Sequence, residues 1–292
     1  MKGDAMTKLL YLECTSGISG DMCAAALLDA GASEEAVRRA LESLPVEGFA
    51  VEISRVKKSG LDVCDFSVVL DAAHENHDHD MAYLHGHGGA SEHGHGHDHD
   101  RDHGRAHDHD HGHGAPGGHH HRGPAEIAQI IDGAAMTDGA KAIAHRMFGF
   151  VADAEARAHG VPVGEVHFHE VGAVDSIADI IAIAVAADDL APDGVVVSDL
   201  PCGYGTVRCQ HGLIPVPAPA TAFIAEAAGL TLSPVDVEGE LVTPTGAAAA
   251  AALRTEAALP ERFSIKAIGM GAGKRAYDTP GILRAMIIEP AE

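Results

Sequence analysis

Apolar residues recur along the chain at two spacings, and together the two spacings predict a succession of strands and helices. Short apolar or alternating runs, typical of strands, occur at residues 9–13, 49–56, 63–70, 166–169, 194–198, 264–268 and 283–288. Helical spacing occurs at residues 22–30, 33–44, 125–131, 140–158, 173–189 and 219–228. Because strands and helices are interleaved, we expect an α/β fold with a mixed sheet flanked by helices.

The helix expected at residues 173–189 is apolar on nearly every side, yet its first turns carry two acids. Asp175 and Asp179 are four residues apart and so lie on one face. An ionised carboxylate in a dry core is costly unless it is paired or binds a cation. In the strand expected just before this helix, His167 and His169 point the same way.

Imidazole and carboxylate groups therefore converge within a short stretch. Nitrogen and oxygen ligands together suit a divalent transition metal such as nickel, zinc or iron. The predicted metal ligands are His167, His169, Glu170, Asp175 and Asp179. In the alternative interpretation Asp175 caps the helix and Asp179 pairs with a lysine or arginine. Asp175, Glu170 and the glycine-flanked His211 are the candidate catalytic groups.

Two loops that precede helices, and one basic turn, are candidate binding elements for an anionic ligand. Free backbone N–H groups and the helix dipole make the start of a helix a ready anion site. Neither loop is a Walker A motif, because the Lys and its Ser/Thr are missing. The candidate binding residues are Ser16, Gly17, Ser19, Gly20, Asp21, Thr243, Thr245, Gly246, Lys274 and Arg275.

A low-complexity tract of His, Asp and Gly interrupts the chain and holds 17 of its 22 histidines. Such a tract cannot build a core, so we expect residues 73–122 to be a disordered, metal-binding insertion. Residues 1–72 and 123–292 would then form one discontinuous α/β domain. The alternative is a solvated surface loop without a role.

The remaining composition narrows the class of protein. A net charge of −23 argues against binding nucleic acid or an anionic membrane, which requires a basic face. No run of eighteen apolar residues and no signal-peptide pattern is present, so a cytoplasmic location is expected. The five cysteines form no CxxC pair, which indicates neither a disulfide framework nor a structural zinc site.

Four segments jointly resemble the LarC family of nickel-insertion proteins. They are Ser16–Met22, His167–Asp179, His211–Thr221 with its repeated prolines, and Thr243–Ala247. Their order, with a His-rich insertion between the first and second, is also similar to that family. The resemblance extends from about residue 8 to 289, and the position of Glu13, where aspartate is expected, departs from it.

The resemblance implies insertion of nickel into pyridinium-3,5-bisthiocarboxylic acid mononucleotide. The product would be the nickel-pincer nucleotide cofactor of lactate racemase and related enzymes. It also implies CTP as cosubstrate, with Mg²⁺ or Mn²⁺, and a further C-terminal domain associated with CTP. Because the sequence stops at Glu292, we expect either that a separate chain supplies that domain or that this protein keeps the metal part and not the nucleotide chemistry. A nickel-dependent racemase and further copies of this chain, forming a homo-oligomer, are the other expected partners.

Two other functions fit the same residues. A non-catalytic nickel or zinc metallochaperone would store metal on the tract and pass it on. A metallohydrolase would use His167, His169 and Asp175 to hold a metal-bound water.

Deleting residues 74–121 tests whether the tract is a reservoir and not the reaction centre. We expect the deletion to lower the number of nickel ions bound and to leave the fold intact, because the tract contributes no core. Equilibrium dialysis gives the stoichiometry, and circular dichroism gives the fold. Loss of secondary structure in the deletion variant would contradict the prediction.

Overall fold

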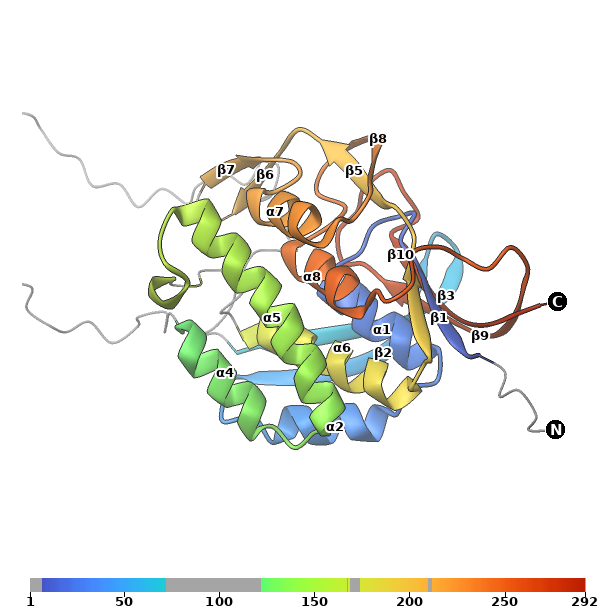
Figure 1. The fold of residues 1–292 in the computed structure, drawn as a ribbon, viewed down its shortest axis with the longest axis horizontal. Helices are drawn as coiled ribbons and strands as arrows, with labels where there is room; N and C mark the ends of the chain where they lie inside the picture. Colours follow the sequence, from blue (N-terminus) through green and yellow to red (C-terminus); the bar gives the residue numbers. More distant parts are fainter. Residues whose placement is uncertain (1–6, 72–121, 167, 169–173, 210–211, 292) are drawn as a thin grey trace, which may run out of the picture.

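A computed structural model describes residues 7–71, 122–166, 168, 174–209 and 212–291, and Figure 1 shows their arrangement. Its strands are β1 (Leu9–Glu13), β2 (Phe49–Lys58), β3 (Leu61–Leu70), β4 (Gly194–Val197), β5 (Leu200–Tyr204), β6 (Thr206–Cys209), β7 (Gly212–Pro215), β8 (Leu232–Glu238), β9 (Phe263–Ala272) and β10 (Ile282–Pro290). Its helices are α1 (Gly20–Asp29), α2 (Glu34–Glu42), α4 (Pro124–Gly133), α5 (Asp138–His159), α6 (Val174–Leu190), α7 (Pro219–Ala228) and α8 (Pro244–Leu253). A short 3₁₀ turn, η1, spans Val163–Glu165.

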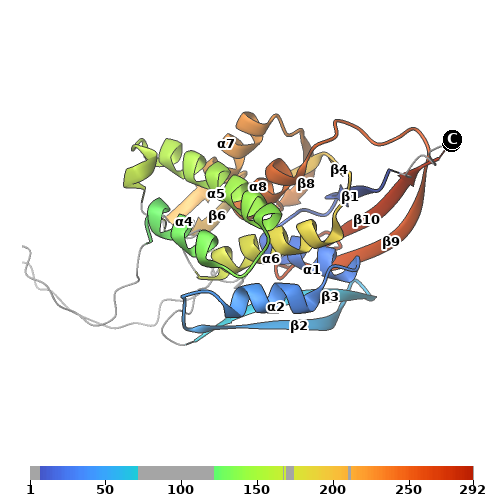
Figure 2. The ribbon, with the colours of Figure 1, turned by 60° about the horizontal axis from the view of Figure 1, so that its bottom comes forward.

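Six strands form the main sheet in the order β2-β3-β9-β10-β1-β4. The β1/β4 and β3/β9 pairs are parallel and the other three pairs are antiparallel. Helices α1, α2 and α6 lie on one side of this sheet (Figure 2). The predicted α/β fold with a mixed sheet flanked by helices is therefore confirmed, and the His-rich insertion lies outside the described residues.

Alternation along the strands divides the sheet into two faces. Leu10 and Leu12 of β1 are fully buried and belong to the main core under the helices. Leu9, the residue before Leu10, belongs instead to a separate small cluster with Met286 and Ile288 of β10. Because side chains alternate in a strand, this cluster lies on the other face of the sheet.

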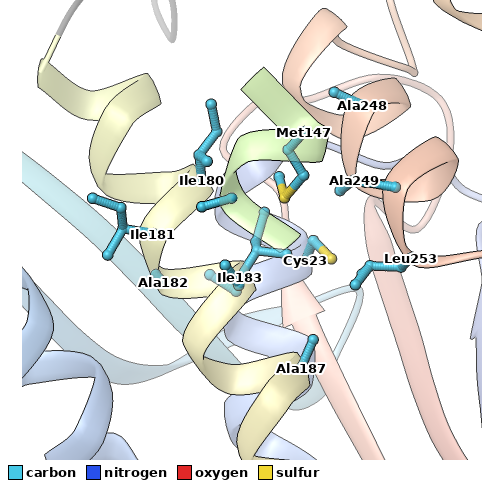
Figure 3. Packing of buried hydrophobic residues seen from close by; sticks show 14 of the residues in the cluster. Cys23, Met147, Ile180, Ile181, Ala182, Ile183, Ala187, Ala248, Ala249 and Leu253 are labelled. Carbon is cyan, nitrogen blue, oxygen red and sulfur yellow. The ribbon is translucent and has the colours of Figure 1, made fainter. Parts of the chain in front are cut away.

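Helix α6 is the centre of the core, as its all-round apolar sequence predicts. It contacts α1, α2, α5 and α8. Its isoleucines pack beside Cys23 of α1, Met147 of α5 and the alanines of α8 (Figure 3). The alanine run of α8 is buried, and its small side chains allow the helices to approach closely.

The secondary structure differs from the sequence-based expectation in three places. Residues 200–215, for which no strand was predicted, contain β5, β6 and β7, because β5 pairs with β8 and β6 pairs with β7. Strand β8 itself was not predicted. The strand expected at 166–169 is absent from the described positions, since neither Val166 nor Phe168 is in a strand. Val166 instead closes the 3₁₀ turn by donating its N–H to Val163 O.

Strand β9 carries glycines where α1 crosses it. A Cβ on Gly271 would overlap the carbonyl oxygen of Met22, and one on Gly269 would overlap that of Ala26. The absence of side chains here sets the distance between α1 and the sheet, and therefore the position of the loop before α1.

Replacing Gly271 with Ala should lower the free energy of unfolding by about 2 kcal/mol or more, because backbone atoms of α1 must move. Gly149→Ala is the matched control. Gly149 lies within α5 with no atom near its would-be Cβ, so alanine there should stabilise by about 0.5–1 kcal/mol. Urea denaturation measures both. Equal effects of the two substitutions would contradict this account of the α1–β9 contact.

Candidate functional site

A cavity of about 150 Å³ opens where three helices begin. The first turns of α1, α6 and α8 all line it, and the connection between β9 and β10 forms another wall. The start of a helix carries a partial positive charge and unpaired N–H groups. The predicted residues that line the cavity are Ser16, Ser19, Gly20, Asp21, Asp175, Asp179, Thr243, Thr245, Lys274 and Arg275.

Two loops far apart in sequence are joined at Ile18. Its N–H donates to Leu241 O at 3.0 Å, and its carbonyl accepts from Thr243 N–H at 3.2 Å. This bridge runs parallel, Ile18 beside Val242, and holds the start of α1 next to the start of α8.

The two predicted binding glycines that do not line the cavity serve this junction. Gly17 has φ +107°, and a Cβ there would overlap Leu241 O. A Cβ on Gly246 would overlap Ile18 O. Gly17 and Gly246 therefore permit the close approach of the two loops, which is a structural role.

The start of α1 is occupied by a carboxylate from its own first turn. Asp21 Oδ1 accepts the Ser19 hydroxyl proton and, at 2.8 Å, the Met22 N–H. Asp21 is 9% exposed, and its Oδ2 is buried without a hydrogen-bond partner among the described residues. A buried, unsatisfied carboxylate oxygen is costly and favours a proton donor or a cation beside it.

Asp21 is joined by Asp175 and Asp179 of α6, and we call these three residues the carboxylate cluster. Burial raises the pKa of Asp179 well above its usual value, and the charges of Asp21 and Asp175 raise it further. Asp179 also lies against Gly20, where a Cβ would overlap its carboxylate. Ionisation of Asp179 is therefore disfavoured, and a positive ligand beside the cluster would stabilise the ionised form.

The alternative interpretation of the two α6 aspartates holds only in part. Asp175 Oδ1 accepts the Ser176 N–H at 2.8 Å, which is a helix-end contact. Asp179 has no ion pair with a lysine or arginine within the described part of the chain. Lys274 is near enough to lower the pKa of Asp179, but its ammonium is paired elsewhere.

The basic turn between β9 and β10 is neutralised by carboxylates that the sequence did not single out. The Lys274 ammonium pairs with Asp65 of β3, and the Arg275 guanidinium pairs with Glu240 at 2.6 Å. Glu240 is buried, and its N–H donates to the Tyr277 hydroxyl at 3.3 Å. Lys274 and Arg275 therefore line the cavity without being free cations.

Lys58 holds this turn in place from the tip of the β2–β3 hairpin. Its ammonium donates to Gly273 O at 2.7 Å and to Arg275 O at 3.0 Å, and burial lowers its pKa. The sequence shows Lys58 only as part of a polar turn. Its role, like those of Asp65 and Tyr277, depends on contacts between distant segments.

Four predicted residues lie outside the described part of the chain: His167, His169, Glu170 and His211. Two residues close to them in sequence are described. Phe168 is buried and packs edge-on against Phe148, with ring centroids 5.3 Å apart. Cys209 lines the cavity. Within the described residues no three His, Cys, Asp or Glu side chains are placed to hold one metal ion, so the five-ligand metal site stays a prediction.

Comparison with known proteins identifies the class to which this fold and cavity belong. Residues 10–292 match the family model described as nickel insertion protein. The chain therefore belongs to the nickel insertion protein family. No solved structure matches it. Among the described residues, no helix is long and apolar enough to cross a membrane.

Relatives with similar sequences carry consistent names. A protein of Alkaliphilus metalliredigens named pyridinium-3,5-bisthiocarboxylic acid mononucleotide nickel insertion protein is 47% identical over 97% of this chain and 61% of its own length. One of the same name from Geobacillus kaustophilus is 37% identical over 97% of this chain and 60% of its own length. A putative nickel insertion protein of Geobacter sp. strain M21 is 38% identical over 98% of this chain and 62% of its own length. The chain thus spans about three fifths of the length of these relatives.

Replacing Asp179 with Asn should stabilise the metal-free protein at pH 7. The unfolded carboxyl ionises near pH 4, whereas the folded carboxyl resists ionisation. Folded wild type therefore binds more protons in this range and loses stability as pH rises from about 4 towards the raised pKa. The variant lacks this loss. Its free energy of unfolding should therefore exceed that of wild type by about 1 kcal/mol at pH 7, and the difference should vanish near pH 4.

Denaturant titrations at pH 4 and pH 7, with a chelator present, measure this difference. Asp153→Asn in the exposed face of α5 is the control and should show no such pH-dependent difference. An Asp179→Asn protein that is less stable than wild type at pH 7 would show that the carboxylate is satisfied in the folded state.

Proposed function

We propose that this chain carries the nickel-inserting part of the activity for which its relatives are named. The observation that supports this most is the cavity itself. It brings a carboxylate cluster that a positive ligand would stabilise together with the start of α8, which attracts an anionic one. A divalent metal and a mononucleotide have these two opposite requirements.

Nickel is a substrate here, and we propose that it enters on the α6 side of the cavity. Asp175 and Asp179 would bind it from the first turns of α6, with His167, His169 and Glu170 from the preceding stretch. Oxygen and imidazole ligands suit nickel. The arriving charge would offset the burial of Asp179 and its repulsion by the other carboxylates, which together raise its pKa.

The reaction we propose replaces one ring hydrogen of the pyridinium by nickel. Two sulfur atoms of the dithio-substituted ligand and one ring carbon bond the metal, and the carbon–hydrogen bond breaks. The released proton passes to a base, for which Asp175, Glu170 and His211 are the candidates. Positioning the ligand beside the metal is the main task of the surrounding cavity walls.

The cosubstrate and the partners belong to the same proposal. CTP with Mg²⁺ or Mn²⁺ would drive the reaction, and the portion of the relatives that this chain does not span would contribute to binding it. Within the described residues, Lys274 and Arg275 are each already paired with a carboxylate. A triphosphate would have to compete with Asp65 and Glu240 for them. The nickel-dependent racemase, the homo-oligomer and the cytoplasmic location remain proposals of the same kind.

Single-turnover incubation followed by mass spectrometry tests the proposed function. The chain is mixed with the pyridinium bisthiocarboxylate mononucleotide, Ni²⁺ and CTP, with and without the remaining portion of the Alkaliphilus relative. Appearance of the nickel adduct, with loss of one ring proton, supports an inserting enzyme. Nickel binding without any adduct in either mixture would support the metallochaperone instead.

A histidine substitution tests the metal side separately. In the protein lacking residues 74–121, His169→Ala should remove one high-affinity nickel equivalent, because an imidazole ligand is lost. His145→Ala is the control, since His145 pairs with Asp132 at 2.8 Å outside the cavity. Calorimetry gives the stoichiometry. Unchanged nickel affinity in the His169→Ala protein would remove that residue from the site.

A further inference from the structure

The three helix starts at the cavity are not equivalent. That of α1 is filled by Asp21, and that of α6 carries Asp175 and Asp179. The start of α8 carries no acidic residue in its first turn. An anionic group entering the cavity is therefore repelled at two of the helix starts and attracted at the third.

The first turn of α8 retains one unused backbone donor. Pro244 has no N–H, the Gly246 N–H bonds Thr243 Oγ1 at 3.1 Å, and the Ala247 N–H bonds Thr243 O at 2.8 Å. The N–H of Thr245 forms no hydrogen bond within the described residues. It is thus the orphan donor of this helix.

The Thr245 side chain supplies a second, independent observation. Thr245 is only 7% exposed, yet it lines the cavity, and its hydroxyl has no hydrogen-bond partner in the described part of the chain. Among the described residues, the fully enclosed side-chain oxygens without a partner are Asp21 Oδ2 and Glu289 Oε2, so the Thr245 hydroxyl is open to the cavity and can bond a ligand there. The Ser16 hydroxyl, on the loop that Ile18 ties to α8, lines the same cavity and is likewise unpartnered among the described residues.

We infer that the α8 start, with Thr245 and Ser16, binds the phosphomonoester of a pyridinium mononucleotide. This inference rests on the proposed function, and it defines the orientation of the mononucleotide substrate in the cavity. The phosphate accepts from the Thr245 N–H and from the two hydroxyls, at the positive end of α8. The pyridinium ring then points to the carboxylate cluster, where nickel is proposed to bind.

The same geometry excludes the basic turn as the primary phosphate site. Lys274 and Arg275 are each held by a carboxylate, and Glu240 is buried. Freeing Arg275 would leave the buried Glu240 carboxylate unpaired, which is strongly unfavourable, and freeing Lys274 would leave the partly buried Asp65 unpaired. The uncharged donors at the start of α8 can bind a phosphate without breaking an ion pair.

Calorimetric binding of two commercially available pyridinium ligands tests the inference. Nicotinic acid mononucleotide carries the phosphate, and nicotinic acid riboside lacks it. Thr245→Val should weaken mononucleotide binding about tenfold or more, because a charge-assisted hydrogen bond is lost. It should change riboside binding less than about twofold. Thr245→Ser, which keeps the hydroxyl, should bind the mononucleotide as wild type does.

Thr231→Val is the matched control, because Thr231 is exposed and lies outside the cavity. Should Thr245→Val unfold, Ser16→Ala provides the same comparison. Equal weakening of both ligands, or no weakening of the mononucleotide, overturns the phosphate assignment alone. If wild type binds neither ligand, the substrate class itself is wrong, and the proposed function fails with it.

Discussion

The site depends on one backbone junction, the pair of hydrogen bonds that Ile18 makes with Leu241 and Thr243. Those bonds bring the loop after β1 against the loop before α8. Gly17 and Gly246 make the approach possible because neither carries a Cβ. Without the junction, the starts of α1 and α8 would not open onto a shared cavity. The glycines of β9 act in the same way where α1 crosses the sheet, because they let α1 pack directly against the strand.

Charge is then distributed unevenly around the cavity. Carboxylates gather at the starts of α1 and α6, where the helix dipoles partly offset them, and burial still raises the pKa of Asp179. The nearby cations are tied to Asp65 and Glu240, and Lys58 holds the turn that carries them. Among the described residues, the α8 start combines a positive end and an unused donor with a first turn that carries no acidic residue. An arrangement of this kind accepts a cation and an anion side by side, as a metal and a mononucleotide require.

Much of this could be predicted from the sequence. Helix α6 was evident from its continuous apolar residues, and Asp175 and Asp179 stood out because acids are costly there. The loop at Ser16 was recognisable as a strand–loop–helix junction, and the loop at Thr243 as the start of a helix. Strands β5, β7 and β8 were missed because each contains a proline, and the pairing of β5 with β8 is non-local. Strand β6 was missed with β7 because the two form a hairpin of only four residues in each strand. The neutralising partners Asp65 and Glu240 were missed for a related reason, since an ion pair between distant segments leaves no local pattern.

The central claim is that nickel is bound inside this cavity, beside the carboxylate cluster. Anomalous scattering at the nickel absorption edge, from crystals of the protein lacking residues 74–121, tests it most directly. The account predicts one strong anomalous peak within bonding distance of Asp175 or Asp179. A nickel peak only at sites remote from α1, α6 and α8, with the cavity free of metal at saturating nickel, would contradict it.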